Sequence, residues 1–173
     1  MAPYPPIERW IVPLKACEQT RLALLPAGRC GCESGVFWLG ERASTSSVAA
    51  VVKPIGSGVV ESPWQWSVAP EVYAAVTAWA KPRGLTLLAA VHSHLSTRRP
   101  RMSPTDRSQG LKVPDALAVI VPTGGDELDT TRWGWFVYES DDYRTLEEKE
   151  LAARVRLTAR GCEYEEISKE GSR

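Results

Sequence analysis

The sequence has no excess of either charge, no long apolar run, and few histidines and cysteines. Its 21 Lys and Arg balance 21 Asp and Glu, which argues against a nucleic-acid or anionic-membrane partner, because both require a positive field. Only Arg98-Arg99-Pro100-Arg101 gathers basic residues. No apolar stretch approaches the roughly 20 residues that cross a bilayer, and residues 1–6 lack the basic and apolar regions of a secretory signal. We therefore expect a cytoplasmic protein without a membrane partner.

The four cysteines are too few and too irregularly spaced for a disulfide framework in a chain of 173 residues. We expect reduced thiols that are mostly buried, since a free cysteine behaves as a small hydrophobic residue. Cys30-Gly31-Cys32 is a weak zinc signal, because neither a second cysteine pair nor a spare histidine is present to complete a tetrahedral site.

The length predicts a single domain over residues 1–173, with short flexible termini at about 1–6 and 168–173. Hydrophobic patterns predict an α/β layered domain. Strands are expected at 9–12 (at an edge), 36–39 and 47–53 (as a hairpin), 85–92, 116–121 and 133–138. Helices are expected at 14–25, where Pro26 ends the pattern, at 71–80, from Ser103 and at 145–157. Residues 56–67 are expected to form a loop or an irregular strand.

The two histidines stand one residue apart, in Val91-His92-Ser93-His94, at the end of a predicted strand. Side chains two positions apart on a strand point to the same face. The pair is therefore half of a possible metal site, although the imidazoles and Ser93 could instead only satisfy one another's hydrogen bonds. Asp106 follows within a short loop and would complete three ligands with an open position, the arrangement of catalytic zinc.

Ser103-Pro104-Thr105-Asp106 has the pattern of a capping box at a helix start, which needs no further function. The two interpretations are compatible, because a carboxylate at a helix N-terminus stays ionised and a zinc ligand must be deprotonated. Hydrolysis at such a metal also requires a general base. Glu33 is the candidate, because it precedes the strand at 36–39, which could run beside the histidine strand. The alternative is a solvated acid at a loop–strand junction.

Together these residues resemble the signature of the JAMM (MPN-plus, prokaryotic JAB-type) zinc metalloproteases. The resemblance covers about residues 33–106 and consists of Glu33 with Gly40 seven residues later, His92-x-His94, and Ser103-x-x-Asp106. It implies an MPN (cytidine-deaminase-like) layered domain with a central mixed sheet flanked by helices. It also implies one catalytic Zn²⁺ ion bound by His92, His94 and Asp106, with Glu33 as the base acting on zinc-bound water and Ser103 as an oxyanion donor.

Members of this family hydrolyse amide bonds, commonly the peptide or isopeptide bond after the C-terminal tail of a ubiquitin-like protein. Small bacterial members occur beside ubiquitin-like proteins and their activating and conjugating enzymes, so the resemblance implies these partners. The bound tail would lie as an added strand beside the site. Two alternatives remain open: a catalytically silent MPN-type scaffold, and a zinc amidohydrolase acting on a sulfur-carrier protein or a small amide.

The sequence departs from the family pattern at two places. Leu95 stands where the family usually has proline, and the stretch from His94 to Ser103 is one residue longer than the common spacing. Neither departure removes a ligand, but both lie in the loop that leads to Ser103.

Two segments are candidate substrate surfaces: residues 56–67, with Trp64 and Trp66, and the loop at 109–114. The alternative for the tryptophans is ordinary packing, because aromatic residues two positions apart share one face of a strand. The arginines at 98, 99 and 101 could contact an acidic partner, or they could simply form a solvated loop.

Overall fold

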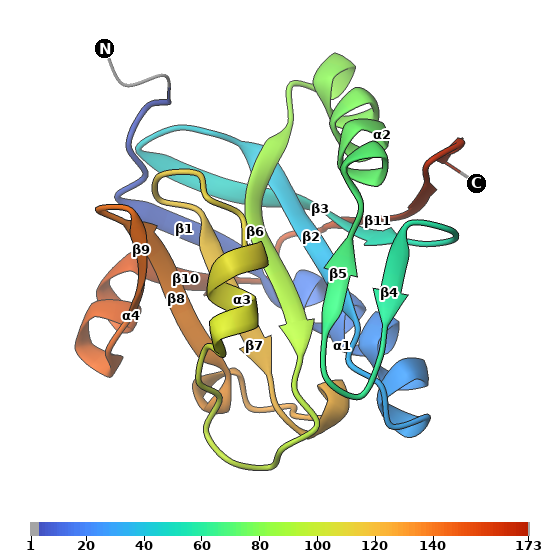
Figure 1. Ribbon diagram of the computed structural model, residues 1–173. Helices are drawn as coiled ribbons and strands as arrows, with labels where there is room; N and C mark the ends of the chain where they lie inside the picture. The colour runs from blue at the N-terminus through green and yellow to red at the C-terminus, as the bar shows by residue number, and fades with distance from the viewer. Residues whose placement is uncertain (1–3, 173) are drawn as a thin grey trace.

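The computed structural model describes residues 4–172 and contains a curled, ten-stranded mixed sheet, with a separate two-stranded hairpin and few helices (Figure 1). In sheet order the strands are β10 (Val155–Thr158), β1 (Arg9–Pro13), β3 (Thr45–Pro54), β2 (Gly35–Glu41), β6 (Thr86–Ser93), β7 (Leu117–Val121), β8 (Gly134–Glu139) and β9 (Asp142–Thr145). Beyond this path, β11 (Glu163–Ser168) pairs with β3 and with β12 (Gly171–Ser172). The hairpin consists of β4 (Val59–Glu61) and β5 (Trp66–Val68).

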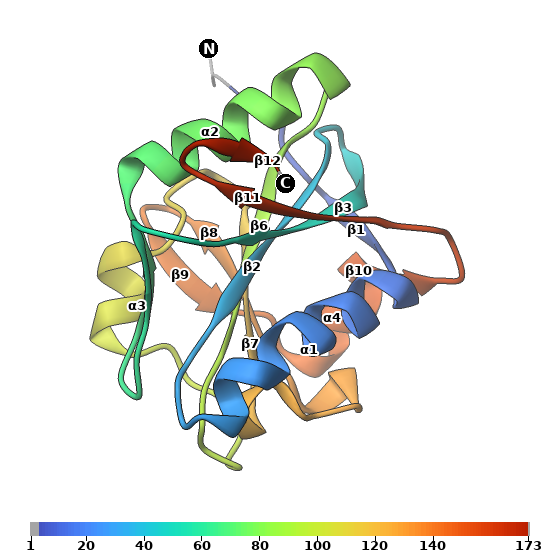
Figure 2. The same ribbon diagram turned by 90° about the vertical axis from the view of Figure 1, so that its right-hand side faces the viewer.

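Helices cover both faces of the sheet (Figures 1 and 2). They are α1 (Leu14–Arg29), α2 (Pro70–Ala80), α3 (Pro104–Gln109) and α4 (Glu148–Arg154), with short 3-10 turns η1 (Lys81–Arg83), η2 (Thr123–Gly125) and η3 (Thr130–Arg132). The alternation of side chains along β2 explains this layering. Val36 and Trp38 belong to the core cluster that includes Leu24 of α1, whereas Phe37 and Leu39 pack in the cluster with Val76 of α2.

A strand is present at each of the predicted places, but one of these strands is wrongly predicted to lie at the edge of the sheet. The strands β2 and β3 form the expected antiparallel hairpin, and β2 also pairs antiparallel with β6, the histidine strand. The strand at 9–12 is not at an edge, because β10, from a distant part of the chain, pairs with it in parallel. Long-range pairing of this kind leaves no local signal in the sequence.

Two helix predictions are wrong at their ends. The first helix does not stop at Pro26 but continues to Arg29. The helix expected at 145–157 is limited to α4, because the residues on either side extend into β9 and β10. Residues 56–67, where we expect a loop or an irregular strand, contain most of the short hairpin β4–β5.

The cysteines are less buried than expected. Only Cys17 is buried, whereas Cys30 is exposed, and Cys32 and Cys162 are half-buried. Near the C-terminus, the segment for which we predict a flexible end contains β12, whose Gly171 pairs with Ser168 of β11. Of the residues at the predicted flexible ends, 1–3 and 173 lie outside those described.

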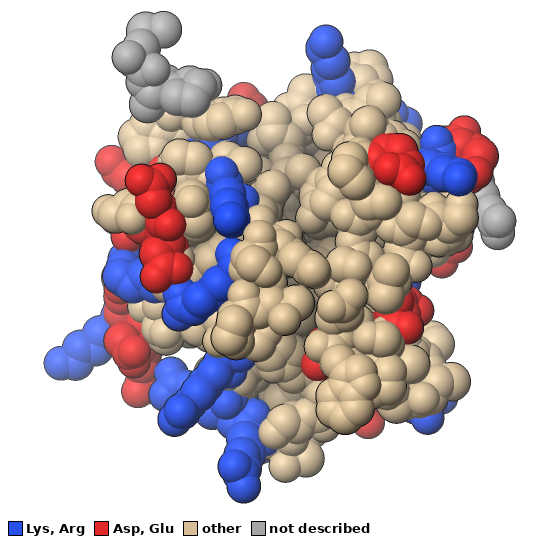
Figure 3. Space-filling model, viewed as in Figure 1, with Lys and Arg blue, Asp and Glu red and all other residues tan. Residues whose placement is uncertain are grey.

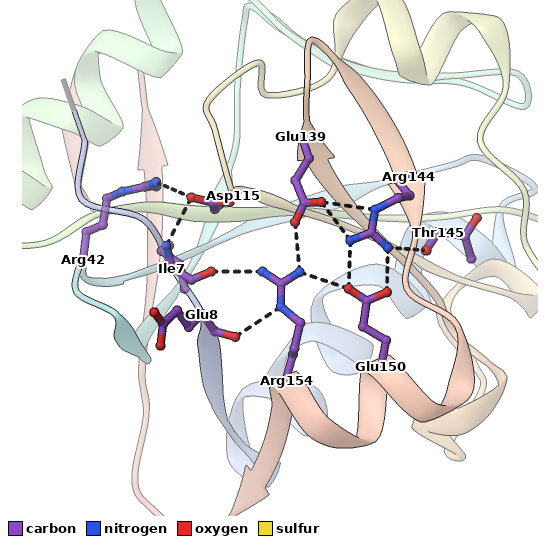
Figure 4. A network of polar contacts seen from close by, with 9 residues as sticks. All are labelled: Ile7, Glu8, Arg42, Asp115, Glu139, Arg144, Thr145, Glu150 and Arg154. Atoms are coloured by element: carbon purple, nitrogen blue, oxygen red, sulfur yellow. Dashed lines mark hydrogen bonds and ion pairs between the residues drawn. The ribbon is translucent and has the colours of Figure 1, made fainter. Parts of the chain in front are cut away.

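Arg154 ties the beginning of β1 to α4 and to the turn between β8 and β9 (Figure 4). Its guanidinium donates hydrogen bonds to Glu139, Glu150 and the backbone oxygens of Ile7 and Glu8, and it lies 4.6 Å from the Trp10 ring centroid. Only 19% of the side chain is exposed, so these contacts are partly protected from water. We expect Arg154→Met to lower the free energy of unfolding by about 2 kcal/mol in urea denaturation, because the two backbone oxygens lose a charged donor.

Arg156 provides the matched control for this substitution, since it lies two residues further along on β10 and is exposed. Arg156→Met is expected to change the unfolding free energy by less than about 0.5 kcal/mol, as is usual at surface positions. Equal effects of the two substitutions would show that the network around Arg154 does not stabilise the fold.

Candidate metal centre

The two histidines lie where β6 ends, between β2 and β7. The backbone of His92 is paired with Gly35 of β2 and with Ile120 of β7. His94 is just beyond the strand, but its backbone N–H donates to Val121 over 3.0 Å, and its carbonyl accepts from Gly124 of η2 over 2.8 Å. Both residues are therefore fixed by the backbone on each side. Their rings lie on the same side, 5.0 Å apart between centroids, as the spacing predicts.

Three candidate ligand residues converge at this end of β6. His92 Nε2 lies 3.1 Å from Asp106 Oδ1, His94 Nε2 lies 3.3 Å from Asp106 Oδ2, and the two Nε2 atoms are 3.1 Å apart. Nitrogen and oxygen ligands about 2.0–2.1 Å from a tetrahedral zinc ion are about 3.3 Å from one another. The spacing of these atoms therefore fits such an ion, and the three residues could hold a metal.

The chemistry of the three groups also fits a cation. Burial would raise the pKa of Asp106, but the hydrogen bonds from His92, His94 and the Ser103 backbone outweigh it and hold the pKa well below its usual range. Burial would lower the pKa of His94, but contact with Asp106 reverses this and raises it. A carboxylate that stays ionised between two imidazoles is a suitable metal ligand.

Asp106 is held in place by the capping box that the sequence predicts. The Ser103 backbone N–H donates to Asp106 Oδ2 over 2.7 Å, and Ser103 Oγ accepts from the Asp106 N–H over 3.1 Å. The structure thus bonds Ser103 to Asp106 rather than to either histidine. Its hydroxyl hydrogen has no acceptor within the described residues, so it remains free to donate to a bound group.

Glu33 lies just before β2, whose Gly35 is the partner of His92. The half-buried side chain makes no hydrogen bond or ion pair within the part of the chain that the structure describes, and it is not one of the three converging residues. Burial raises the pKa of Glu33 to about 7, with the His94 imidazole opposing the rise and the Asp106 carboxylate adding to it. The carboxyl group therefore interacts electrostatically with the centre and is suited to proton transfer near neutral pH.

We expect the Glu33 carboxyl group of the metal-free protein to titrate at about pH 7, because burial disfavours its charged form. Adding Zn²⁺ should move this titration to lower pH, since a nearby cation favours the carboxylate. The measurement is the side-chain carboxyl carbon shift against pH by NMR, with Glu33→Gln to assign the resonance. A midpoint at about 4.3, the value of a solvated glutamate, would contradict the prediction.

A groove of about 460 Å³ runs beside the centre, between the β4–β5 hairpin and α3. Both segments proposed as substrate surfaces contribute to it: Val60 and Trp66 from the hairpin, and Gly110 from the loop after α3. His92 and Asp106 form its inner end. The groove therefore leads directly to the candidate ligands.

The two tryptophans of the hairpin do not share a face, contrary to the packing alternative. Trp66 lies in β5 and packs near Phe37, with ring centroids 5.5 Å apart. Trp64 lies in the turn, where Ser62 Oγ accepts from the backbone N–H groups of Trp64 and Gln65, and it is 86% exposed. The period of two ends at the turn, so the ordered turn presents Trp64 to solvent.

A larger cavity, of about 780 Å³, lies beyond the loop that joins β6 to α3. Arg98 and Arg99 line one side of it and Trp133 and Trp135 the other, but none of the five candidate site residues contributes. In the view of Figure 3, Lys and Arg side chains gather at the lower left of the molecule. Two of the candidate ligands, His92 and Asp106, line the smaller groove instead.

Sequence reasoning misses three polar residues next to the centre, Ser34, Lys53 and Glu61, and the contact of Ser93 with the first of them. Ser93, between the histidines, is fully buried and bonds to Ser34, which also contacts Lys53 and Glu61. The available signal is a lysine at the end of the apolar run 48–52 of β3, whose Val51 and Val52 are buried. A buried lysine usually requires an acidic partner.

The sequence matches no family model and no curated protein. Among solved structures, a protein from Desulfitobacterium hafniense, determined in solution, superposes with a TM-score of 0.63 at 17% identity, covering 87% of this chain and 94% of that one. This similarity shows a shared fold. A JAB1/MPN domain protein from Archaeoglobus fulgidus has a TM-score of 0.44 at 13% identity, covering 86% of this chain and 96% of that one, which is too loose to support an argument. No helix among the described residues is long and apolar enough to cross a membrane.

Proposed function

We propose that the protein is a zinc-dependent peptidase or isopeptidase that hydrolyses the amide bond after the C-terminal tail of a ubiquitin-like protein. The observation that carries the proposal is the convergence of His92, His94 and Asp106 beside a groove that His92 and Asp106 line, with Glu33 interacting electrostatically with His94 and Asp106. The JAMM-like order of these residues in the sequence supplies the substrate class. The MPN, cytidine-deaminase-like layering implied by the same resemblance is part of the proposal.

His92, His94 and Asp106 would hold the metal. A bound zinc ion supplies Lewis-acid polarisation and lowers the pKa of water. Glu33 accepts a proton from the attacking water as its oxygen bonds to the scissile carbonyl carbon, and then delivers that proton to the amine nitrogen as the C–N bond breaks. The Ser103 hydroxyl donates to the developing oxyanion, a role that its free hydrogen permits.

The groove suits an extended peptide. The strand β5 pairs with β4 on one side only, so its other edge offers backbone groups to an added strand. Gly58, Ala69 and Gly110 are among the residues that line the groove. A ubiquitin-like substrate, and through it the activating and conjugating enzymes that act on the same tail, are the partners we propose.

The test is cleavage of ubiquitin-like fusions by the zinc-loaded protein. Substrates joined through a peptide bond or a lysine isopeptide bond are incubated with the protein, and the products are identified by mass. We expect a cut directly after the tail that a chelator abolishes and added Zn²⁺ restores. A folded protein with stoichiometric zinc that cuts none of the fusions would contradict the proposal and favour a binding scaffold or an amidohydrolase for other substrates.

A further inference from the structure

Three polar side chains meet where the hairpin β4–β5 lies against the beginning of β2. Lys53 Nζ donates to Ser34 Oγ and, over 2.5 Å, to Glu61 Oε1, and Ser34 Oγ donates to the same carboxylate oxygen over 2.5 Å. Ser34 is fully buried and Lys53 is 8% exposed. A charge at the depth of Lys53 is costly unless it is paired, so its ammonium group depends on Glu61, whose own side chain is 35% exposed.

On one side, this cluster contacts the histidine strand. Ser34 Oγ belongs to the cluster, while its backbone N–H donates to Ser93 Oγ over 3.1 Å, and its carbonyl accepts from the Ser93 N–H over 2.8 Å. Ser93 lies between His92 and His94. The backbone that begins at Glu33 is thus bonded to the segment that carries both candidate ligands.

On the other side, the cluster holds the hairpin. Glu61 ends β4, and the next residue, Ser62, accepts the backbone N–H of Glu33 over 2.7 Å. Trp66 packs so closely over Gly35 that an added methyl group would lie 2.5 Å from its ring atom Cε2. The hairpin and the backbone around Glu33 are therefore joined by one main-chain hydrogen bond, one ring contact and the ion pair of Lys53 and Glu61.

We infer that Lys53 is a positioning residue that fixes the Glu33 carboxylate and the hairpin wall of the groove through its bonds to Glu61 and Ser34. The inference rests on the role proposed for Glu33 as the base. Without the ammonium group, Glu61 would be left beside Ser34 with no counter-charge, and it would turn towards water. Because Glu61 and Ser62 are consecutive, that movement would weaken the backbone hydrogen bond from Glu33 to Ser62. The Glu33 side chain could then occupy a wider range of positions.

The first experiment needs no metal and no substrate. Amide hydrogen exchange is measured in the wild type, in Lys53→Met, which keeps the length of the side chain but removes its charge, and in Lys15→Met. Lys15 is half-exposed and pairs with Glu18 on α1, so its loss is the matched control. We expect the Glu33 amide to exchange roughly tenfold faster in Lys53→Met, the effect of weakening one hydrogen bond, and to be unchanged in Lys15→Met.

The second experiment measures the zinc-loaded enzyme. Lys53→Met is expected to bind the same amount of zinc as the wild type but to lose roughly 10- to 100-fold in kcat, since a small displacement of a catalytic group has an effect of that order. In the metal-free variant, the pH at which Glu33 titrates should also fall towards that of a solvated glutamate. Exchanging the charges, with Lys53→Glu and Glu61→Lys together, is expected to recover part of both losses.

The outcomes separate this inference from the proposed function. Unchanged Glu33 amide exchange in a folded Lys53→Met protein would overturn the inference, and so would a wild-type kcat in that variant. If Lys53→Met fails to fold, the same two measurements are made on Glu61→Gln, which keeps the size of the side chain, and their results decide the inference. A wild-type protein that cleaves no fusion would refute the proposed function, while the exchange result would still decide whether Lys53 holds the hairpin in place.

Discussion

Replacing Glu33 with Gln is expected to slow amide hydrolysis by about 10²- to 10⁴-fold while zinc stays bound. Glutamine has nearly the same shape as glutamate but cannot accept a proton from water. Glu33 is not among the three converging residues, so its amide should leave the metal in place. The measurement is kcat on a cleavable fusion, together with the zinc content of the purified variant.

Glu41 is the matched control for this substitution, because it is exposed and lies at the other end of the same strand from Gly35, the partner of His92. Glu41→Gln should retain the wild-type rate. Full activity in Glu33→Gln would show that another group takes the proton. A loss of zinc in that variant would instead assign Glu33 to the ligand set.

Zinc is expected to raise the melting temperature by about 5–10 °C when its concentration is 100 times its dissociation constant, and Asp106→Asn should abolish this shift. Ligand binding at that excess stabilises a folded protein by about 2.7 kcal/mol, and each kcal/mol raises the melting temperature of a domain of this size by about 2–4 °C. Asparagine keeps an oxygen that can accept from Ser103 but loses the anionic charge that a metal ligand needs.

Asp129 offers a control for the capping role, since its side chain also accepts a backbone N–H, from Thr131, at the start of η3. Asp129→Asn removes a similar charge at a capping position outside the converging group and should leave the zinc-induced shift intact. A shift that persists in Asp106→Asn would place the metal elsewhere. A shift lost in both variants would point to a general effect of charge.

The sequence predicts that His92, His94 and Asp106 lie together because their signals are local. Two histidines one residue apart at the end of an apolar run identify a strand end, and Ser103 with Asp106 identifies a helix start. Glu33 requires one further step, the pairing of β2 with β6, and the structure confirms that pairing. These residues come together because short-range patterns fix the ends of elements that are neighbours in the sheet.

The features that sequence reasoning misses depend on contacts between distant segments. The ion pair of Lys53 and Glu61 exists only because the hairpin folds back over the end of β3. The separation of Trp64 from Trp66 depends on the turn at 62–65, and the pairing of β10 with β1 joins the two ends of the chain. Each of these arises from tertiary contacts, which override periodicity and propensity.

The closing of the curled sheet by α4 has a consequence for behaviour at high concentration. The two terminal strands of the sheet path, β9 and β10, are joined by α4 alone, and Arg144 of β9 is bonded to Glu150 of that helix. A free strand edge is a template for edge-to-edge aggregation unless charge or another element protects it. The helix and the guanidinium groups at these edges therefore act against self-association, and Arg154→Met should aggregate on heating before Arg156→Met does.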